Sequence, residues 1–157
     1  MATDEAQIVY ADTSGLYALL DAADGRHDEA STIVRSLLSD GAVRVTSNYV
    51  VTELTALVQS RLGLDVALRV HRALLPALEV VFVDRGLHER AVAAWAAAQR
   101  RGLSLVDCAG FELMRDLGVV TALAFDRPRE PLQHTVGRQM GRTWSRQAGS
   151  SPQPSTW

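Results

Sequence analysis

The sequence predicts an α/β domain, a three-layer sandwich in which helices flank a short, largely parallel β-sheet. Strand-like runs of apolar and β-branched residues alternate along the chain with segments of helical periodicity, as in parallel strands joined by helical connections. The chain has 157 residues, of which 47% are hydrophobic and 22% charged, and these values fit one globular domain with a single core.

Four segments have the character of buried strands. The first is a short apolar run that ends at Ala11, and the third is rich in Val and carries Phe82, residue types that favour strands. The second and fourth are also apolar and lie between turn signals such as Gly41 and Gly118. The expected strands are residues 7–11, 43–46, 78–83 and 119–125.

The segments between and after these strands carry apolar residues at helical spacing. Thr13 or Ser14 can cap the first helix and Ser47 or Asn48 the third, because short polar side chains accept hydrogen bonds from free amides at a helix start. Glycine or proline follows several of the segments and ends them. The expected helices contain residues 16–20, 28–38, 50–62, 65–75, 88–100 and 105–117.

Four acidic residues stand where a folding sequence normally has an apolar or small residue. Asp12 and Asp126 directly follow the first and last strands, and Glu53 and Asp107 lie on helices beside apolar positions. In parallel sheets, functional groups gather at the carboxyl ends of the strands. A cluster of carboxylates repels itself and resists burial unless a cation neutralises it. We therefore predict that the four acids form one pocket for a divalent metal ion.

Each acid also has a structural interpretation. Asp12 can cap the helix that follows it, and Asp107 can form a capping box with Ser104. Glu53 can lie on a solvated flank of its helix, and Asp126 can begin a turn. These alternatives stay open for each acid alone, but four acids that are all attached to core elements favour a functional site.

Composition excludes several kinds of chemistry. All of the 16 residues counted as Lys or Arg are arginine, which excludes a Walker A phosphate loop and any lysine-based mechanism. The one cysteine, Cys108, excludes an intramolecular disulfide and a multi-thiolate metal site. The formal net charge is −2, so binding to nucleic acid would depend on local basic patches.

The two ends of the chain indicate its organisation and location. The acidic N-terminus has no signal-like pattern, and no apolar run approaches the length of a membrane span, so we expect a cytoplasmic protein that makes no membrane contact. We divide the chain into a folded domain at residues 1–132 and a loosely ordered tail at residues 133–157, where apolar anchors are few.

The order and context of the four acids resemble those of the PIN-domain nucleases, and most closely the VapC-type ribonuclease toxins of prokaryotic toxin–antitoxin pairs. The resemblance covers about residues 8–127. Beyond Asp126, family members often carry an aromatic-containing segment and a compact final strand, whereas this chain continues with arginines and prolines. The motifs that carry the likeness are Ala11-Asp12-Thr13-Ser14, Val51-Thr52-Glu53-Leu54, Ser104-Leu105-Val106-Asp107-Cys108-Ala109 and Ala124-Phe125-Asp126.

This resemblance implies a PIN fold whose acidic active site binds Mg²⁺ or Mn²⁺ and cleaves RNA, with a small cognate antitoxin as inhibitor. Asp12, Glu53, Asp107 and Asp126 fall on the family's acidic positions, and Thr13 or Ser14 on a hydroxyl position that supports the pocket. The helices that contain residues 16–20 and 33–38 are the expected walls of an antitoxin groove.

Chemistry then assigns a role to each acid. Mg²⁺ takes one or two direct carboxylates and keeps several waters, so we expect Asp12 and Asp107 as the main ligands and Asp126 to complete the site directly or through water. Glu53 is the candidate to orient or deprotonate the attacking water. Because lysine is absent, arginines must bind the RNA phosphates, and the candidates are Arg26, Arg85, Arg101 and Arg127.

Other functions remain to be separated from this one. Dehalogenase-type phosphatases and phosphoacceptor receiver domains also gather acids at strand ends, but both rely on a lysine that this chain lacks. The remaining alternative is a catalytically inactive PIN-like module that binds RNA or protein. The sequence leaves the oligomeric state open, and a homodimer is one of the states considered.

Overall fold

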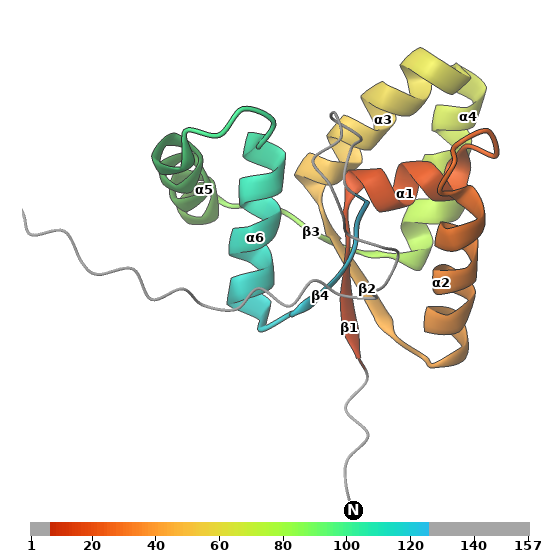
Figure 1. Cartoon of the computed structure of the whole chain (residues 1–157), viewed down its shortest axis with the longest axis horizontal. Helices are drawn as coiled ribbons and strands as arrows, with labels where there is room; N and C mark the ends of the chain where they lie inside the picture. The colour runs from red at the N-terminus through yellow and green to blue at the C-terminus, as the bar shows by residue number, and fades with distance from the viewer. Residues whose placement is uncertain (1–6, 126–157) are drawn as a thin grey trace, which may run out of the picture.

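The structure is a computed structural model, and it describes residues 7–125. The predictions made for Asp126, Arg127 and the tail at residues 133–157 therefore lie outside the described residues. Helices lie on both sides of a central sheet, with α5 and α6 on one side and α1, α2 and α4 on the other (Figure 1). The elements are β1 (Ile8–Ala11), α1 (Thr13–Leu20), α2 (His27–Ser39), β2 (Val43–Ser47), α3 (Asn48–Leu62), α4 (Leu64–Arg69), β3 (Glu79–Val81), α5 (Arg85–Ala98), α6 (Leu105–Leu117) and β4 (Thr121–Leu123).

The sheet has the order β3-β2-β1-β4, and each of the three strand pairs is parallel. The predicted fold class, a short parallel sheet flanked by helices, is therefore confirmed. Because all four strands run in one direction, their carboxyl ends meet at one edge of the sheet, which we call the carboxyl edge. This topology brings together the segments that follow Ala11, Ser47, Val81 and Leu123.

Successive residues of β1 supply the cores on opposite faces of the sheet, because side chains alternate along a strand. Tyr10 packs on one face in the larger core, together with Leu54 of α3 and Leu113 of α6. Val9 packs on the other face with Leu37 of α2 and Leu123 of β4. The central strand is thus buried on both faces, as its continuous apolar sequence predicted.

Four elements differ clearly in extent from the prediction, among them α5, which begins earlier than expected. The helix expected at residues 65–75 is an α-helix only to Arg69, followed by a π-helical segment at Val70–Leu74 and a 3₁₀ turn at Leu75–Ala77. Pro76 has no N–H group to continue an α-helix, so the chain leaves the helix through these two irregular turns. The strands expected at 78–83 and 119–125 are each reduced to three residues, β3 and β4.

The junction between β3 and α5 explains two of the errors. The N–H group of Val83 donates to the side-chain oxygen of Asn48 at 2.8 Å, so this residue does not extend the strand. Asp84 then caps α5 by accepting a hydrogen bond from the Leu87 N–H group at 2.8 Å, and the helix begins at Arg85 rather than at His88.

In residues 7–125, no helix combines the length and the apolar character needed to cross a membrane.

Candidate active site

Asp12 lies at the carboxyl edge, directly after β1, and is the N-cap of α1. Its Oδ2 atom accepts hydrogen bonds from the Ser14 hydroxyl at 2.8 Å and from the Ser14 N–H group at 3.4 Å. The Ser14 hydroxyl oxygen also accepts from the Phe125 N–H group at 2.9 Å. Ser14 therefore links Asp12 to the segment that follows β4, which continues into Asp126 outside the described residues.

Glu53 is held next to α1 by Thr13. The buried hydroxyl of Thr13 donates to Glu53 Oε2 at 2.5 Å, which connects the start of α1 to the second turn of α3. Glu53 is half-buried, so its carboxylate faces the protein as well as solvent. Glu53 thus lies at the border of the solvated flank that its sequence position allowed, and it also contacts α1.

Asp107 takes part in the capping box that its sequence context allowed. Its Oδ2 atom accepts the Ser104 N–H group at 2.7 Å, and its own N–H group donates to the Ser104 hydroxyl at 3.0 Å. The structural interpretations of Asp12 and Asp107 are thus both correct. They do not exclude metal binding, because a carboxylate has two oxygens with about four lone-pair sites and each cap uses one oxygen.

The charges of the acids raise the pKa of groups near them. Burial is the largest cause that raises the pKa of the Asp12 carboxyl, and the negative charge of Asp107 raises it further, against hydrogen bonds from Ser14 that lower it. Burial also raises the pKa of the Tyr10 hydroxyl, and the charges of Asp12, Asp107 and Glu53 add to this rise. The charges of Asp12 at the start of α1, Glu53 on α3 and Asp107 on α6 therefore all act on one buried phenol.

The raised pKa of Asp12 has a consequence for stability. A carboxyl group whose pKa is higher in the folded than in the unfolded protein favours folding while it is protonated. That contribution is fully present below the unfolded-state pKa and is lost as the pH rises through the folded-state pKa. Ionisation of Asp12 therefore opposes folding, and a bound cation would relieve this penalty.

The donor set suits a divalent cation. Within residues 7–125, neither Asp12 nor Asp107 forms an ion pair with a basic side chain, so their charges have no protein counter-ion there. That same part of the chain contains no group of three or more Asp, Glu, His or Cys side chains arranged to hold a metal ion. Two carboxylates with bound waters are a sufficient protein contribution for Mg²⁺.

Three residues at the base of the site were not found from the sequence. The Tyr10 hydroxyl lies 3.4 Å from the Ser47 hydroxyl, and Ser47 caps α3 by accepting the Val50 N–H group at 3.2 Å. Gly110, one turn after Asp107, leaves room for the Tyr10 ring, because a Cβ atom there would lie 2.8 Å from the phenol oxygen. Tyr10 therefore contacts the elements that carry Glu53 and Asp107.

Another glycine lets α1 approach β4. A Cβ atom on Gly15 would collide with the carbonyl oxygen of Leu123 and lie 2.7 Å from its Cγ atom. The Leu123 carbonyl also accepts the Asp12 N–H group at 3.1 Å. Such requirements have no local sequence signal, because the atoms that crowd each glycine come from a distant segment.

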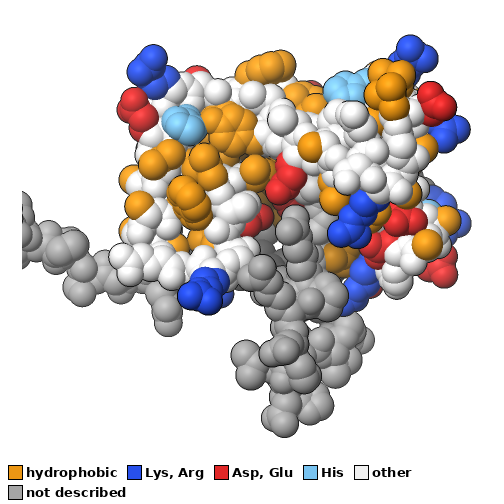
Figure 2. All heavy atoms as spheres, turned by 90° about the horizontal axis from the view of Figure 1, so that it is seen from above, with side chains coloured by type: hydrophobic (Ala, Val, Ile, Leu, Met, Phe, Trp, Pro, Cys, Tyr) orange, Lys and Arg blue, Asp and Glu red, His pale blue; other side chains and the backbone are white. Residues whose placement is uncertain are grey.

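The candidate phosphate-binding arginines lie in different settings. Arg26 pairs with Glu29 at 3.0 Å and lies over the Phe125 ring, with its Cζ atom 5.6 Å from the ring centre. Arg85 and Arg101 are exposed at the start of α5 and in the α5–α6 connection. On the face seen in Figure 2, acidic side chains lie near the middle and hydrophobic side chains gather on the side of α5 and α6.

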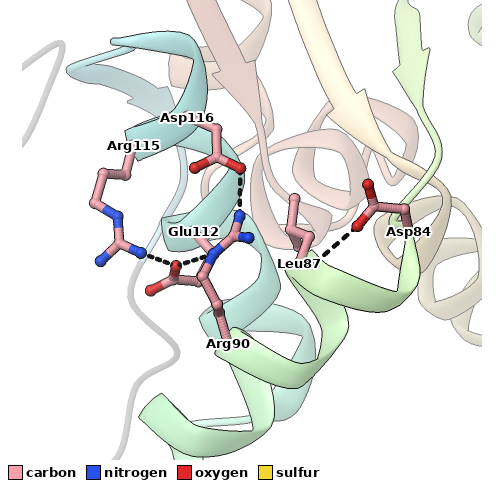
Figure 3. Close-up of polar contacts among 6 residues, drawn as sticks. All are labelled: Asp84, Leu87, Arg90, Glu112, Arg115 and Asp116. Atoms are coloured by element: carbon pink, nitrogen blue, oxygen red, sulfur yellow. Dashed lines mark hydrogen bonds and ion pairs between the residues drawn. The ribbon is translucent and has the colours of Figure 1, made fainter.

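A separate group of charges joins α5 to α6 (Figure 3). Glu112 is buried and pairs with Arg90 Nε at 3.1 Å and with Arg115, and Arg90 also pairs with Asp116. Each acid in this group has a basic partner, in contrast to Asp12 and Asp107. We assign the group a structural role, since it fixes the helix whose first turn carries Asp107.

Comparison with known proteins gives consistent matches. The family model described as PIN domain matches residues 9–128. Among curated proteins, the 23S rRNA-specific endonuclease VapC20 from two strains of Mycobacterium tuberculosis is 33% identical over 127 residues, which cover 76% of this chain and 89% of the relative.

A solved structure agrees with the sequence match. The crystal structure of VapC20 from Mycobacterium tuberculosis, described as a sarcin–ricin loop cleaving toxin, has a TM-score of 0.67 and 34% identity, and the match covers 75% of this chain and 89% of that one. The family model spans more than half of the chain, and the sequence and structural matches span most of both proteins. This chain therefore belongs to the PIN-domain family.

Proposed function

We propose that this protein is a divalent-metal-dependent endoribonuclease and the toxin of a toxin–antitoxin pair. The observation that carries the proposal is that Thr13 and Ser14, the first two residues of α1, hydrogen-bond Glu53 and Asp12 at the carboxyl edge, where the charge of Asp107 also raises the pKa of Asp12. The relatives are named as 23S rRNA-specific and as cleaving the sarcin–ricin loop. Ribosomal RNA is accordingly the proposed substrate class, and the cytoplasm the proposed location.

The roles of the residues follow from their surroundings. In our proposal Asp12 and Asp107 hold Mg²⁺ or Mn²⁺, and Asp126 completes the site. When bound, the ion supplies charge stabilisation at the phosphoryl oxygens and lowers the pKa of a bound water. Glu53 orients or deprotonates the attacking water, and the Thr13 hydroxyl, which donates to its Oε2 atom at 2.5 Å, holds its carboxylate beside the start of α1.

The proposed inhibitor is a cognate antitoxin, and an apolar cavity supports this part of the proposal. The cavity has a volume of about 120 Å³ and is lined by residues of α1, α2, the neighbouring strands and the segment before β3. Leu16 and Leu19 form its α1 wall, and Val34, Leu37 and Leu38 its α2 wall. An amphipathic helix or an extended apolar segment is the kind of partner that such a groove accepts.

Metal binding can be tested without any RNA. Because the ionised acids repel one another, millimolar Mn²⁺ should raise the melting temperature of the wild-type chain, since it binds the folded state only. The Asp12→Asn/Asp107→Asn double variant should melt at the same temperature with and without Mn²⁺. Differential scanning fluorimetry at neutral pH measures both.

The same experiment at acidic pH serves as a control. Carboxylate ligands must be deprotonated to bind a metal ion, so the stabilisation by Mn²⁺ should weaken as the pH is lowered. An equal Mn²⁺ response from the wild-type chain and the double variant would show that the ion binds elsewhere, and it would count against the proposed site.

A further inference from the structure

Phe82 is an aromatic side chain that the fold leaves in solvent. It is 76% exposed, more than any other large hydrophobic residue in the described part of the chain. A single exposed apolar residue is common on protein surfaces and by itself needs no explanation. Phe82, however, directly follows β3, and its position and neighbours indicate a function for its exposed ring.

Phe82 lies at the carboxyl edge, the edge that carries Asp12. The registers pair Tyr10 with Val45 and Ser47 with Val81. Continued by two residues past Tyr10, the first register brings Asp12, directly after β1, level with Ser47 and Val81. Phe82 is the next residue after Val81. Two strand spacings of about 4.8 Å separate β3 from β1, so the backbones at Phe82 and Asp12 are roughly 10 Å apart.

The backbone on either side of Phe82 is fixed. Asn48 accepts the Val83 N–H group at 2.8 Å, which ties the residue after Phe82 to the start of α3. The Tyr49 hydroxyl lies 2.6 Å from His88 Nδ1 and joins the first turns of α3 and α5. The exposed ring is therefore presented by an anchored segment, which lowers the entropy lost when a ligand binds to it.

A basic residue stands beside this ring in the sequence and has no acidic partner. Arg85 is the first residue of α5, three positions after Phe82, and it is exposed. Within residues 7–125 it forms no ion pair. Phe82 and Arg85 thus offer, three residues apart, the two kinds of group with which proteins bind single-stranded nucleic acid, an aromatic face for base stacking and a guanidinium for phosphate contacts.

We propose that Phe82 and Arg85 form a substrate subsite in which the Phe82 ring stacks on an unpaired RNA base and Arg85 binds a neighbouring phosphate. The inference rests on the proposed ribonuclease function and adds to it a specificity element next to the acids. The stacked base belongs to the nucleotide next to the scissile phosphate, on the part of the RNA that extends from the acids toward β3. Base stacking accepts every base, so the subsite selects for an unpaired nucleotide rather than for one sequence.

Fluorescence anisotropy of the full chain with a short single-stranded oligoribonucleotide, in EDTA to prevent turnover, measures this binding directly. Phe82→Ala should weaken RNA binding about fivefold to a hundredfold, the range that loss of one stacked base gives. Phe82→Trp should retain binding, whereas Phe82→Leu, which is apolar but has no π face, should not. Arg85→Gln should reduce the slope of log K against log salt by about 1.

Val120→Ala is the matched control, because Val120 is 64% exposed and directly precedes β4. In the order β3-β2-β1-β4, β4 is the outer strand on the side of the sheet away from β3. It should bind RNA like the wild type. An oligonucleotide with 2-aminopurine adds a readout that altered folding would not reproduce, since its fluorescence should be quenched by the wild type and by Phe82→Trp only. Circular dichroism confirms that each variant is folded.

Three outcomes would count against this account, and they are distinguishable. Wild-type affinity for RNA in Phe82→Ala would overturn the subsite. If that variant kept its RNA affinity but lost a copurifying protein partner, Phe82 would belong to a protein interface instead. Wild-type affinity in Phe82→Leu would overturn stacking as its mechanism. A wild-type chain that neither binds nor cleaves RNA would overturn the proposed function itself, and the subsite with it.

Discussion

Replacing Asp107 by Asn should reduce metal-dependent RNA cleavage on the order of a hundredfold or more while the protein stays folded. The Asn side-chain oxygen can still accept the Ser104 N–H group, so the capping box loses little, and the change in stability should stay within about 1 kcal/mol. The negative charge that would hold the ion is lost. Cleavage assays with circular dichroism and thermal melting of the same samples measure the two effects.

Asp116→Asn is the matched control for Asp107→Asn. Both residues lie on α6, but Asp116 pairs with Arg90 on the surface, and a surface ion pair contributes little. This variant should cleave RNA like the wild type. If Asp107→Asn also cleaved at the wild-type rate, Asp107 would be a helix cap only and would have to be removed from the metal site.

Replacing Gly15 by Ala should destabilise the protein by about 2 kcal/mol and lower its Tm by about 5 °C or more. In an ordinary helix this change stabilises by about 1 kcal/mol, because glycine is the more flexible residue. Here the added Cβ atom would meet the Leu123 backbone, and α1 would have to move away from β4. Thermal and urea unfolding measure the loss.

The displacement should also disturb the site, since Asp12 and Ser14 hold the end of β4 through the Leu123 carbonyl and the Phe125 N–H group. Gly86→Ala provides the control. Gly86 lies in α5, and a Cβ atom there would come no closer than 3.6 Å to a neighbouring atom. Gly86→Ala should be neutral or slightly stabilising; equal destabilisation by both variants would contradict the packing argument for Gly15.

The fold could be predicted because the alternation of strand and helix signals is strong along residues 7–125. Every expected strand and helix is present. The helix expected at 65–75 loses its regular end before Pro76, whereas the error at the end of β3 occurs where a side chain from elsewhere competes with the backbone. Asn48, for example, takes the Val83 N–H group that a longer β3 would have used. A contact between residues so distant in sequence has no pattern in either segment.

The candidate site was predictable to the extent that acids at strand ends and helix starts are unusual. Position alone indicated Asp12 and Asp107, and the capping motifs around them were visible in the sequence as well. The position of Tyr10 was hidden, because an aromatic residue in a buried strand has the same pattern whether or not the charges of nearby acids act on its hydroxyl. The need for glycine at positions 15 and 110 depends on the crossing of distant elements.

The central claim is that the acids at the carboxyl edge form one metal-dependent ribonuclease site. The most direct measurement is cleavage of an RNA that contains the sarcin–ricin loop by the full chain, stripped with EDTA and then supplied with Mg²⁺ or Mn²⁺. The account predicts no cleavage in EDTA, recovery on addition of either ion, and no recovery in a parallel preparation of Asp12→Asn. Cleavage by the wild-type chain and by Asp12→Asn at equal rates, with or without the ion, would contradict it.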